Sequence, residues 1–402
     1  MKKEWIDRKV LYVHGSKRFI TPDEEVYGFE KDILISLKER YLYLGADVKF
    51  VQFGIAVDKS YVSGMINLKE NGIDVIPVKY YFTPQVCQYR KETKKVIYEA
   101  VRQCDILIVR VPSFISYIAQ HAAIKYKKPY LTEVVACPWD ALWNHSYKAK
   151  LIAPFAFFKC KKNVAKSEYA IYVSNEFLQK RYPNSKKTCA VSDVILQEIP
   201  DDIIQKKIDR LASIKDKIII TTLAAVDVLY KGQHFVIEAI ANLKKRGYHF
   251  EYHIAGSGDR TRLKNIAERF GVSNQVIFEG MLTADQVFEL LDNTDIYVQP
   301  SKQEGLPRAV VEAMSRGCVC IGSYAGGIPE LLDDICLFNQ GSVIQIIRIF
   351  EKLLQDKNLL VQQSISNFDS AKKFKHTVLE KKRRDFYDEF IRDNFESNLN
   401  SF

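Results

Sequence analysis

Two glutamates stand eight positions apart in the segment QEGLPRAVVEAMSRG, residues 303–317, with a proline and an arginine between them. Pro307 suits the first position of a helix, because proline lacks an N–H that the first turn would leave unpaired. Gly317 suits the residue just past the end of that helix. The segment therefore predicts a loop that holds Glu304, followed by a short helix that carries Glu312.

Such a helix start is suited to binding phosphate, because its backbone N–H groups are unpaired and its end carries a partial positive charge. Gly305 lies just before it. Eight residues at helical rise cover roughly 12 Å, comparable to the distance from the sugar to the ribose in a nucleotide sugar. Glu304 and Glu312 would then meet hydroxyl groups at the two ends. The alternative is that Glu304 caps the helix and Glu312 lies on a solvated face.

Other loops of the second half offer groups for a diphosphate. Lys231 precedes a glycine near a helix start and can place an ammonium there, and Arg308 can add a fork of donors. Without the other loops, Lys231 would be read as a solvent-exposed charge. Gly256 in AGSGD permits close backbone approach, although so short a glycine pair is weak evidence for nucleotide binding by itself.

Strands alternate with helices along most of the chain, which predicts an α/β protein with parallel sheets covered on both faces. KVLYVH, residues 9–14, reads as a buried first strand that ends at Gly15. A polar, charged segment within 195–215 predicts the domain boundary. We expect two doubly wound, Rossmann-like domains facing a cleft, with ligands outside the carboxyl ends of the strands. They are an N-terminal acceptor-binding domain (1–198, with helix 376–402 packing back on it) and a C-terminal nucleotide-sugar donor-binding domain (199–375).

Composition agrees with a folded two-domain protein: 402 residues, 47% hydrophobic and 27% charged. No stretch of 18 apolar residues occurs, so we expect a cytoplasmic protein that does not span a membrane. The eight cysteines are scattered and read as reduced and structural. The net charge of +10 indicates an acidic partner, such as nucleic acid, an anionic membrane surface or a phosphorylated substrate.

Five motifs occur in order in the second half: YKGQHFVIEAIANL, IAGSGD, VIFEGML, DIYVQPSKQEGLPRAVVEAMSRG and GGIPELL. Over about residues 217–340 they resemble the donor domain of the family-4 retaining glycosyltransferases of GT-B fold. The resemblance implies that Glu304 contacts the donor sugar, that Glu312 binds the ribose and that Lys231 holds the diphosphate. It also implies that Gly305, Leu306 and Pro307 present backbone to the sugar and diphosphate.

The sequence departs from that family at two places. Many members carry an arginine where this chain has Val226, so a second diphosphate cation must come from elsewhere, with Arg308 as a candidate. Family members often place a histidine after a strand of the first domain, but this chain has Glu133 there. His14 is therefore only a candidate for the reaction centre, beside Gly15 as a donor-binding candidate, and it is equally suited to packing at a strand end.

The chain contains no Asp-x-Asp pair, the usual carboxylate pair for a metal-bound nucleotide. Lys231, Arg308 and the helix N-terminus can stabilise the negative charge of a departing diphosphate instead. We therefore expect no metal and no cofactor, with a nucleotide-diphosphate sugar as substrate.

Residues 148–166, KAKLIAPFAFFKCKKNVAK, carry six lysines and no acidic residue around an apolar run. Such a segment suits an anionic membrane surface or a lipid diphosphate acceptor. The alternative is a buried helix with solvated lysines at its ends, and Pro154 interrupts a simple amphipathic pattern. Trp139, Asp140 and His145 just before or near this run are candidates for the acceptor side.

These observations predict a retaining, metal-independent glycosyltransferase that moves a sugar from a nucleotide sugar to a glycan or lipid-linked acceptor in cell-surface polysaccharide biosynthesis. It would be a cytoplasmic enzyme, with the inner face of the cytoplasmic membrane as a candidate location. A GT-B sugar phosphorylase or an epimerase is one alternative. A non-catalytic basic protein that binds glycan or nucleic acid is another, but the lysines gather beside an apolar run and no nucleic-acid reading motif occurs, so we expect no nucleic-acid partner.

Overall fold

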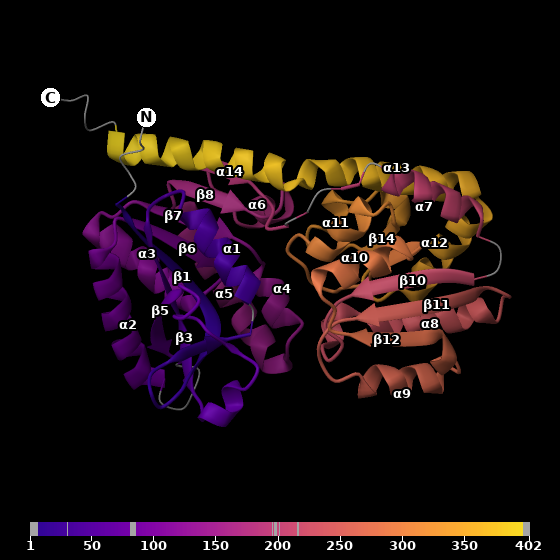
Figure 1. Cartoon of the computed structure of the whole chain (residues 1–402), viewed down its shortest axis with the longest axis horizontal. Coiled ribbons are helices and arrows are strands. Elements are labelled where there is room, and N and C mark those ends of the chain that lie inside the picture. Colours follow the sequence, from indigo (N-terminus) through magenta and orange to yellow (C-terminus); the bar gives the residue numbers. More distant parts are fainter. Residues whose placement is uncertain are drawn as a thin grey trace.

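The computed structural model describes residues 7–29, 31–80, 86–194, 196, 199–200, 202–214 and 217–396. Figure 1 shows two α/β halves side by side, the first in indigo to magenta and the second in pink to orange, with yellow helices along one edge of both. Each half contains a mainly parallel sheet with helices on its faces. The predicted fold class is thereby confirmed.

The first half contains a nine-stranded sheet. Its strands are β1 (Lys9–Ile20), β2 (Val26–Gly28), β3 (Asp47–Ala56), β4 (Ile66–Asn67), β5 (Asp74–Lys79), β6 (Ile106–Val111), β7 (Tyr130–Val134), β8 (Tyr169–Tyr172) and β9 (Lys187–Ala190). Its helices are α1 (Lys31–Tyr41), α2 (Val86–Gln103), α3 (Phe114–Tyr126), α4 (Pro138–Trp143), α5 (Tyr147–Ala165) and α6 (Phe177–Arg181). The parallel strands lie in the order β5-β3-β1-β6-β7-β8-β9, and β2 pairs antiparallel with β1.

The predicted end of the first strand at Gly15 is wrong, because β1 continues to Ile20. Its register against β3 shifts between Val13 and Lys17, so the strand passes Gly15 through an irregularity. The extension pairs on both sides, with Phe19 opposite Tyr27 of β2 and Ile55 of β3. Pairing to two neighbours supplies backbone hydrogen bonds that a loop would lack.

The second half contains a six-stranded parallel sheet in the order β12-β11-β10-β13-β14-β15. Its strands are β10 (Lys217–Leu223), β11 (His249–Ala255), β12 (Val276–Gly280), β13 (Ile296–Gln299), β14 (Val319–Ser323) and β15 (Leu337–Phe338). Its helices are α7 (Ile203–Ala212), α8 (Gln233–Lys244), α9 (Thr261–Arg269), α10 (Ala284–Asp292), α11 (Arg308–Ser315), α12 (Val343–Gln355) and α13 (Lys357–Ala371). The sequence pattern predicted this alternation because both faces of a parallel sheet are buried.

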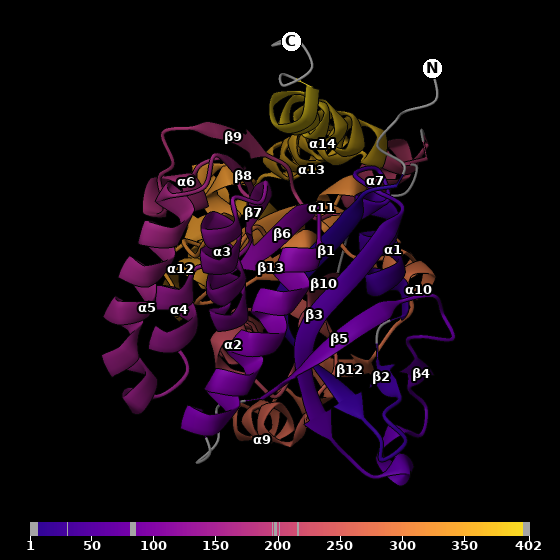
Figure 2. The same ribbon diagram turned by 90° about the vertical axis from the view of Figure 1, so that its left-hand side faces the viewer.

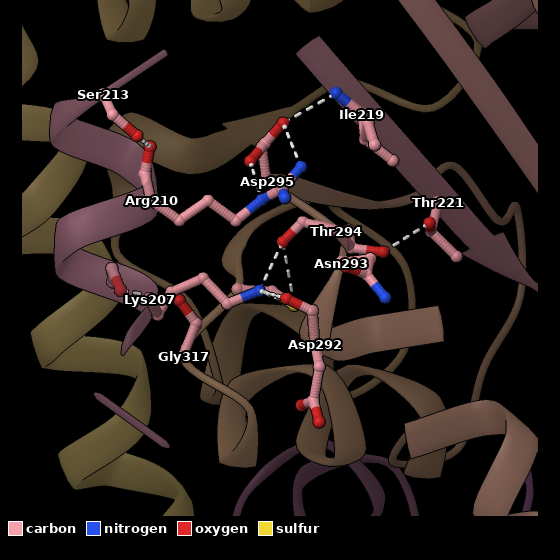
Figure 3. A network of polar contacts seen from close by, with 12 residues as sticks. Lys207, Arg210, Ser213, Ile219, Thr221, Asp292, Asn293, Thr294, Asp295 and Gly317 are labelled. Atoms are coloured by element: carbon pink, nitrogen blue, oxygen red, sulfur yellow. Dashed lines mark hydrogen bonds and ion pairs between the residues drawn. The ribbon is translucent and has the colours of Figure 1, made fainter. Parts of the chain in front are cut away.

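Helix α7 is tied to the second sheet by polar contacts from its basic residues (Figure 3). Lys207 is 2% exposed, and its ammonium donates to the carbonyl of Thr294 at 2.6 Å. Arg210 pairs with the buried Asp295 at 2.7 Å. The same carboxylate accepts from the backbone N–H of Ile219 at 2.7 Å. Because the buried charges are paired and hydrogen-bonded, α7 is held to the second half rather than the first.

The last helix, α14 (His376–Ile391), lies over the first half (Figures 1 and 2). Tyr43 of the segment after α1 donates its hydroxyl to Asp388 at 2.7 Å. The ring of Tyr169 in β8 packs edge-on against Phe390, with the centroids 5.0 Å apart. The chain therefore crosses back to the first half at its C-terminal end. Residues 397–402 of the helix predicted over 376–402 lie outside the described residues.

Candidate active site

A cavity of about 480 Å³ opens beyond the carboxyl ends of β10, β11 and β13, and we call it the C-terminal cavity. The residues predicted from sequence that line it are Lys231, Gly256, Glu304, Leu306, Pro307, Arg308 and Glu312. The lining is completed by Leu223, Ala224, Ala225, Ala255, Ser257, Met281, Leu282, Val287, Gln299 and Ala309. Carboxyl ends of neighbouring parallel strands share one edge of a sheet, so loops far apart in sequence meet here.

Glu304 is held between two donors at the wall of the C-terminal cavity. The Lys231 ammonium donates to its Oε1 at 2.7 Å, and the Gln299 amide donates to the same oxygen at 3.0 Å. The side chains of Lys231 and Glu304 are 20% and 12% exposed. The candidate diphosphate cation and the candidate sugar carboxylate are therefore paired with each other in this structure, and a diphosphate would compete for the lysine.

Glu312 projects from α11, whose N-terminus borders the same cavity. Burial raises the pKa of the Glu312 carboxyl, and the nearby Arg308 opposes that shift only in part. Helix α11 begins at Arg308, so Pro307 is the residue before the helix and not its first residue as predicted. Pro307 keeps an extended backbone with φ −72° and ψ 114°. The chain between the two glutamates is therefore helical only from residue 308 onward. Their separation does not follow from helical rise over all eight residues.

Two glycines near the cavity allow close backbone approach. Gly256 has φ +153°, and a Cβ there would lie 2.1 Å from the carbonyl oxygen of Ala224. Gly305 lies at the junction of the two halves, where a Cβ would lie 2.6 Å from the carbonyl oxygen of Val135. Side chains at these positions would collide with backbone, which cannot move aside cheaply. The two halves are thus in direct contact beside the glutamate loop.

A second cavity, of about 360 Å³, is lined mostly by the first half and by three residues of the second, and is called the N-terminal cavity. It is lined by Tyr12, His14, Ser16, Arg18, Ser36, Leu37, Arg40, Gln52, Arg110, Val135, Val173, Asp193, Gly305, Leu306 and Arg308. Leu306 and Arg308 line both cavities, so the two adjoin across the junction of the halves.

His14 lies in the N-terminal cavity, with its Nδ1 2.7 Å from the hydroxyl of Ser16. Burial, reinforced by Arg110 and Arg18, lowers the pKa of the imidazole to about 3. His14 is therefore neutral at pH 7. Gly15 lines neither cavity, and a Cβ there would lie 2.8 Å from the Ser113 hydroxyl.

Several residues of the N-terminal cavity were not predicted from sequence. Arg40 pairs with Asp193 at 2.9 Å, and Arg110 pairs with Asp193 as well. Arg110 also donates to Glu133 at 3.2 Å. These side chains come from α1, β6, β7 and the segment after β9, and none lies in a local motif. Placement as single polar residues in or beside apolar strands could have signalled Arg110, Glu133 and Asp193, whereas Arg40 follows other charged residues in α1.

The candidate acceptor-side residues are held by contacts within the first half. Trp139 stacks on Trp143, with ring centroids 5.2 Å apart and an interplanar angle of 12°. Asp140 pairs with Arg181 at 3.0 Å, and His145 is exposed. None of Trp139, Asp140 and His145 lines either cavity.

Residues 148–166 lie mostly within α5, a 19-residue helix that contains Pro154. Among the described residues, no helix combines the length and apolar character that crossing a bilayer requires. In the same part of the chain, no group of three or more His, Cys, Asp or Glu side chains is arranged to hold a metal ion. The seven cysteines whose side chains are described are free thiols, as predicted, and the side chain of Cys87 lies outside the description.

Comparison with known proteins agrees with the geometry. Residues 204–367 match the family model described as glycosyl transferases group 1. CapJ of Staphylococcus aureus is 30% identical over 318 residues, which cover 77% of this chain and 78% of CapJ. AmsK of Erwinia amylovora, an amylovoran biosynthesis glycosyltransferase, is 36% identical over 110 residues, covering 26% of this chain and 27% of AmsK.

Solved structures share the fold at low sequence identity. HepE of Anabaena in complex with UDP superposes with a TM-score of 0.66 at 15% identity, covering 95% of this chain and 100% of HepE. Sucrose-phosphate synthase of Thermosynechococcus elongatus gives a TM-score of 0.70 at 12% identity, covering 96% of this chain and 100% of the synthase. Together with the extended match to CapJ, these findings show that the chain belongs to the group 1 glycosyltransferases and has the GT-B fold.

Proposed function

We propose that this glycosyltransferase transfers a sugar, with retention and without a metal, from a nucleotide-diphosphate sugar to a glycan or lipid-linked acceptor in cell-surface polysaccharide biosynthesis. One observation carries the donor assignment: Lys231, Glu304, Glu312 and the start of α11 line a single cavity. HepE was crystallised with UDP, which supports a nucleotide ligand of this kind. The name of AmsK, a glycosyltransferase of amylovoran biosynthesis, supports a polysaccharide product.

The donor would bind with its diphosphate beside Lys231 and the N-terminus of α11. Cleavage of the bond between sugar and diphosphate builds negative charge on the leaving phosphate. Arg308 and the backbone N–H groups of α11 border the cavity, and the Lys231 ammonium would turn from Glu304 to the phosphate, so that all three stabilise that charge. Glu304 would bind the sugar, and its contact with Gln299 keeps the carboxylate oriented after the lysine turns toward phosphate. Glu312 would accept hydrogen bonds from the ribose.

The donor assignment is tested by calorimetry with UDP, GDP, ADP and their sugars in the presence of EDTA. We expect one nucleotide family to bind, with turnover that persists in EDTA and yields a product of unchanged anomeric configuration by NMR. A protein that binds none of these nucleotides would overturn the assignment. Turnover that stops in EDTA and returns with Mg²⁺ would overturn metal independence, and an inverted product would overturn retention.

We also propose that α5 binds the inner, anionic surface of the cytoplasmic membrane. Tyr147, Leu151, Phe155 and Phe158 lie three or four positions apart, so they share one face of α5, and they are 88%, 83%, 61% and 65% exposed. The six lysines of 148–166 surround this row. Apolar side chains that enter the headgroup layer beside lysines that meet anionic lipid are the features of an interfacial helix.

Vesicle sedimentation tests the membrane proposal. Vesicles with a third of their lipid anionic should retain the wild type, and neutral vesicles should retain less. The double variant Phe155→Ser, Phe158→Ser should lose most binding, whereas Ile344→Ser, which changes a residue 60% exposed on α12, should not. Equal retention of the wild type and the double variant would refute a membrane role for α5.

A further inference from the structure

The glutamate loop, which carries Glu304 between β13 and α11, packs against residues 324–330, which follow β14 and which we call the β14 loop. Gly326 has φ +57°, and a Cβ there would lie 2.1 Å from the carbonyl oxygen of Glu304. The backbone N–H of Gly327 donates to the carbonyl of Gly305 at 2.6 Å. Backbone lies directly on backbone, because neither glycine of the β14 loop has a side chain to keep the loops apart. A movement of the β14 loop would therefore carry the glutamate loop with it.

The β14 loop ends at Glu330, whose carboxylate reaches the first half. Its Oε2 accepts from the backbone N–H of Asn175 at 2.6 Å, and its Oε1 accepts from the backbone N–H of Phe177 at 2.6 Å. Phe177 is the first residue of α6, and the side chain of Glu176 before it makes no capping hydrogen bond. A carboxylate that accepts from backbone N–H groups at a helix start forms stronger hydrogen bonds than a neutral group does. Glu330 therefore supplies, from the second half, the N-terminal cap that the side chain of Glu176 does not provide.

Helix α6 is a fixed part of the first half, on the side that faces the second (Figure 1). At its end, Arg181 pairs with Asp140 of α4 at 3.0 Å. Shortly before α6, Val173 lines the N-terminal cavity. A Cβ at Gly305 would lie 3.8 Å from the side chain of Val173, in ordinary van der Waals contact. Glu330 and the glutamate loop therefore meet neighbouring parts of the first half.

A further polar contact crosses the same junction. The side-chain amide of Asn144, just after α4, donates to the carbonyl of Lys302 at 3.5 Å. This hydrogen bond is long and joins two neutral groups, whereas both hydrogen bonds of Glu330 are short and involve a charge. The carboxylate of Glu330 therefore holds the junction more firmly than the amide of Asn144 does.

We propose that Glu330 is a positioning residue for the transfer reaction: by capping α6 across the junction, it keeps the two halves closed, so that the C-terminal and N-terminal cavities adjoin beside the glutamate loop. Glu330 lines neither cavity, so it acts through the β14 loop and not on a substrate. The inference rests on the proposed function, because a reaction at the junction requires a donor in the C-terminal cavity.

Small-angle X-ray scattering of the full chain tests the closed arrangement and needs no ligand. Glu330→Ala removes both hydrogen bonds, and Glu330→Gln keeps the shape of the side chain but removes its charge. Both variants should show a larger radius of gyration than the wild type, because molecules with separated halves become more populated. The change should be larger in Glu330→Ala, and Glu330→Gln keeps the test decisive if Glu330→Ala fails to fold.

The matched control is Glu351→Ala. The carboxylate of Glu351, on α12, pairs with Arg246 at 2.6 Å, and both residues belong to the second half. Its loss breaks an ion pair without touching the junction. The radius of gyration of this variant should therefore equal that of the wild type.

Kinetics test whether the closed arrangement serves the reaction. The substrate is the nucleotide sugar that the donor panel identifies, with water as the acceptor, and the release of nucleoside diphosphate is followed. Glu330→Ala should lower kcat about tenfold, while KM and the Kd of the nucleotide stay within about twofold of the wild type. We expect kcat to change without KM because Glu330 lies outside the cavity that binds the donor. Glu351→Ala should keep the kcat of the wild type.

The inference is overturned if Glu330→Ala and Glu330→Gln keep the radius of gyration of the wild type, or if they keep its kcat. A loss of nucleotide affinity as large as the loss of kcat would also overturn it, because Glu330 would then act in donor binding. All these outcomes compare the variants with a wild type that binds nucleotide. A wild type that binds no nucleotide would instead refute the proposed function, whatever the scattering shows.

Discussion

The two cavities adjoin, yet they are built in different ways. The largest single contribution to the C-terminal cavity comes from one stretch, residues 299–312, which supplies a strand end, a loop and a helix start. The charged lining of the N-terminal cavity comes one residue at a time from β1, α1, β6, the segment after β9 and the start of α11. A site built from the backbone at a helix N-terminus is encoded by one continuous segment, which a sequence motif can reveal. A site built from paired side chains can draw each residue from a different element, and such residues share no motif.

The largest expected effect is a loss of catalytic rate when the cation of the C-terminal cavity is removed. Lys231→Ala should lower kcat about 10²-fold to 10³-fold, because the leaving diphosphate loses its ammonium and Glu304 loses its cation. Steady-state kinetics with the identified donor measures it. Lys217→Ala removes an exposed lysine of β10 that pairs with Glu251 and serves as the control. A nearly normal rate in Lys231→Ala would exclude this lysine from the reaction.

The second prediction concerns the side-chain network of the N-terminal cavity. Asp193→Asn should lower the free energy of unfolding by about 3 kcal/mol, since two guanidinium groups lose their shared carboxylate. The Asp193 carboxylate has a pKa below its ordinary value, so its contribution is present above about pH 4 and is lost as the pH falls through the lowered pKa. Denaturant unfolding at several pH values should therefore show the difference from wild type shrinking in acid. A difference that stays constant with pH would show that the charge is not responsible.

The third and smallest effect concerns Glu312. Glu312→Gln should weaken nucleotide binding about tenfold, because the ribose hydroxyls lose a charged acceptor. Calorimetry with the identified nucleotide measures this loss. Glu268→Gln, at an exposed position of α9, is the control. Unchanged nucleotide affinity in Glu312→Gln would mean that its carboxylate is only part of a buried helix face.

Glu312→Gln should also slightly stabilise the free protein. The folded-state pKa of Glu312 is raised, so the folded protein holds this proton more firmly than the unfolded chain does. Ionising Glu312 therefore costs stability as the pH rises above about 4.3, and the neutral glutamine avoids that cost. Thermal unfolding at pH 7 should show a higher Tm for the variant. A lower Tm would mean that the carboxylate has a stabilising partner.

Much of the fold followed from pattern. Alternating apolar strands and amphipathic helices predicted both sheets because a parallel sheet buries each strand on two faces. The errors lie where pattern is weakest. β1 continues past Gly15 because pairing with β2 and β3 outweighs a local break, and α11 starts one residue after Pro307. The pairing of Lys231 with Glu304 could not be predicted, because 73 residues separate them in the sequence.

The sequence alone determined the donor-side candidates, since a glycine loop, a helix start and two glutamates at fixed spacing are local features that backbone chemistry dictates. It also determined the apolar and basic composition of α5. Only the tertiary structure decided that four arginines line one cavity, that Leu306 and Arg308 belong to both cavities, and that the apolar side chains of α5 remain exposed. The reason is physical: burial and charge pairing between distant segments depend on how the elements pack, and no local pattern records that packing.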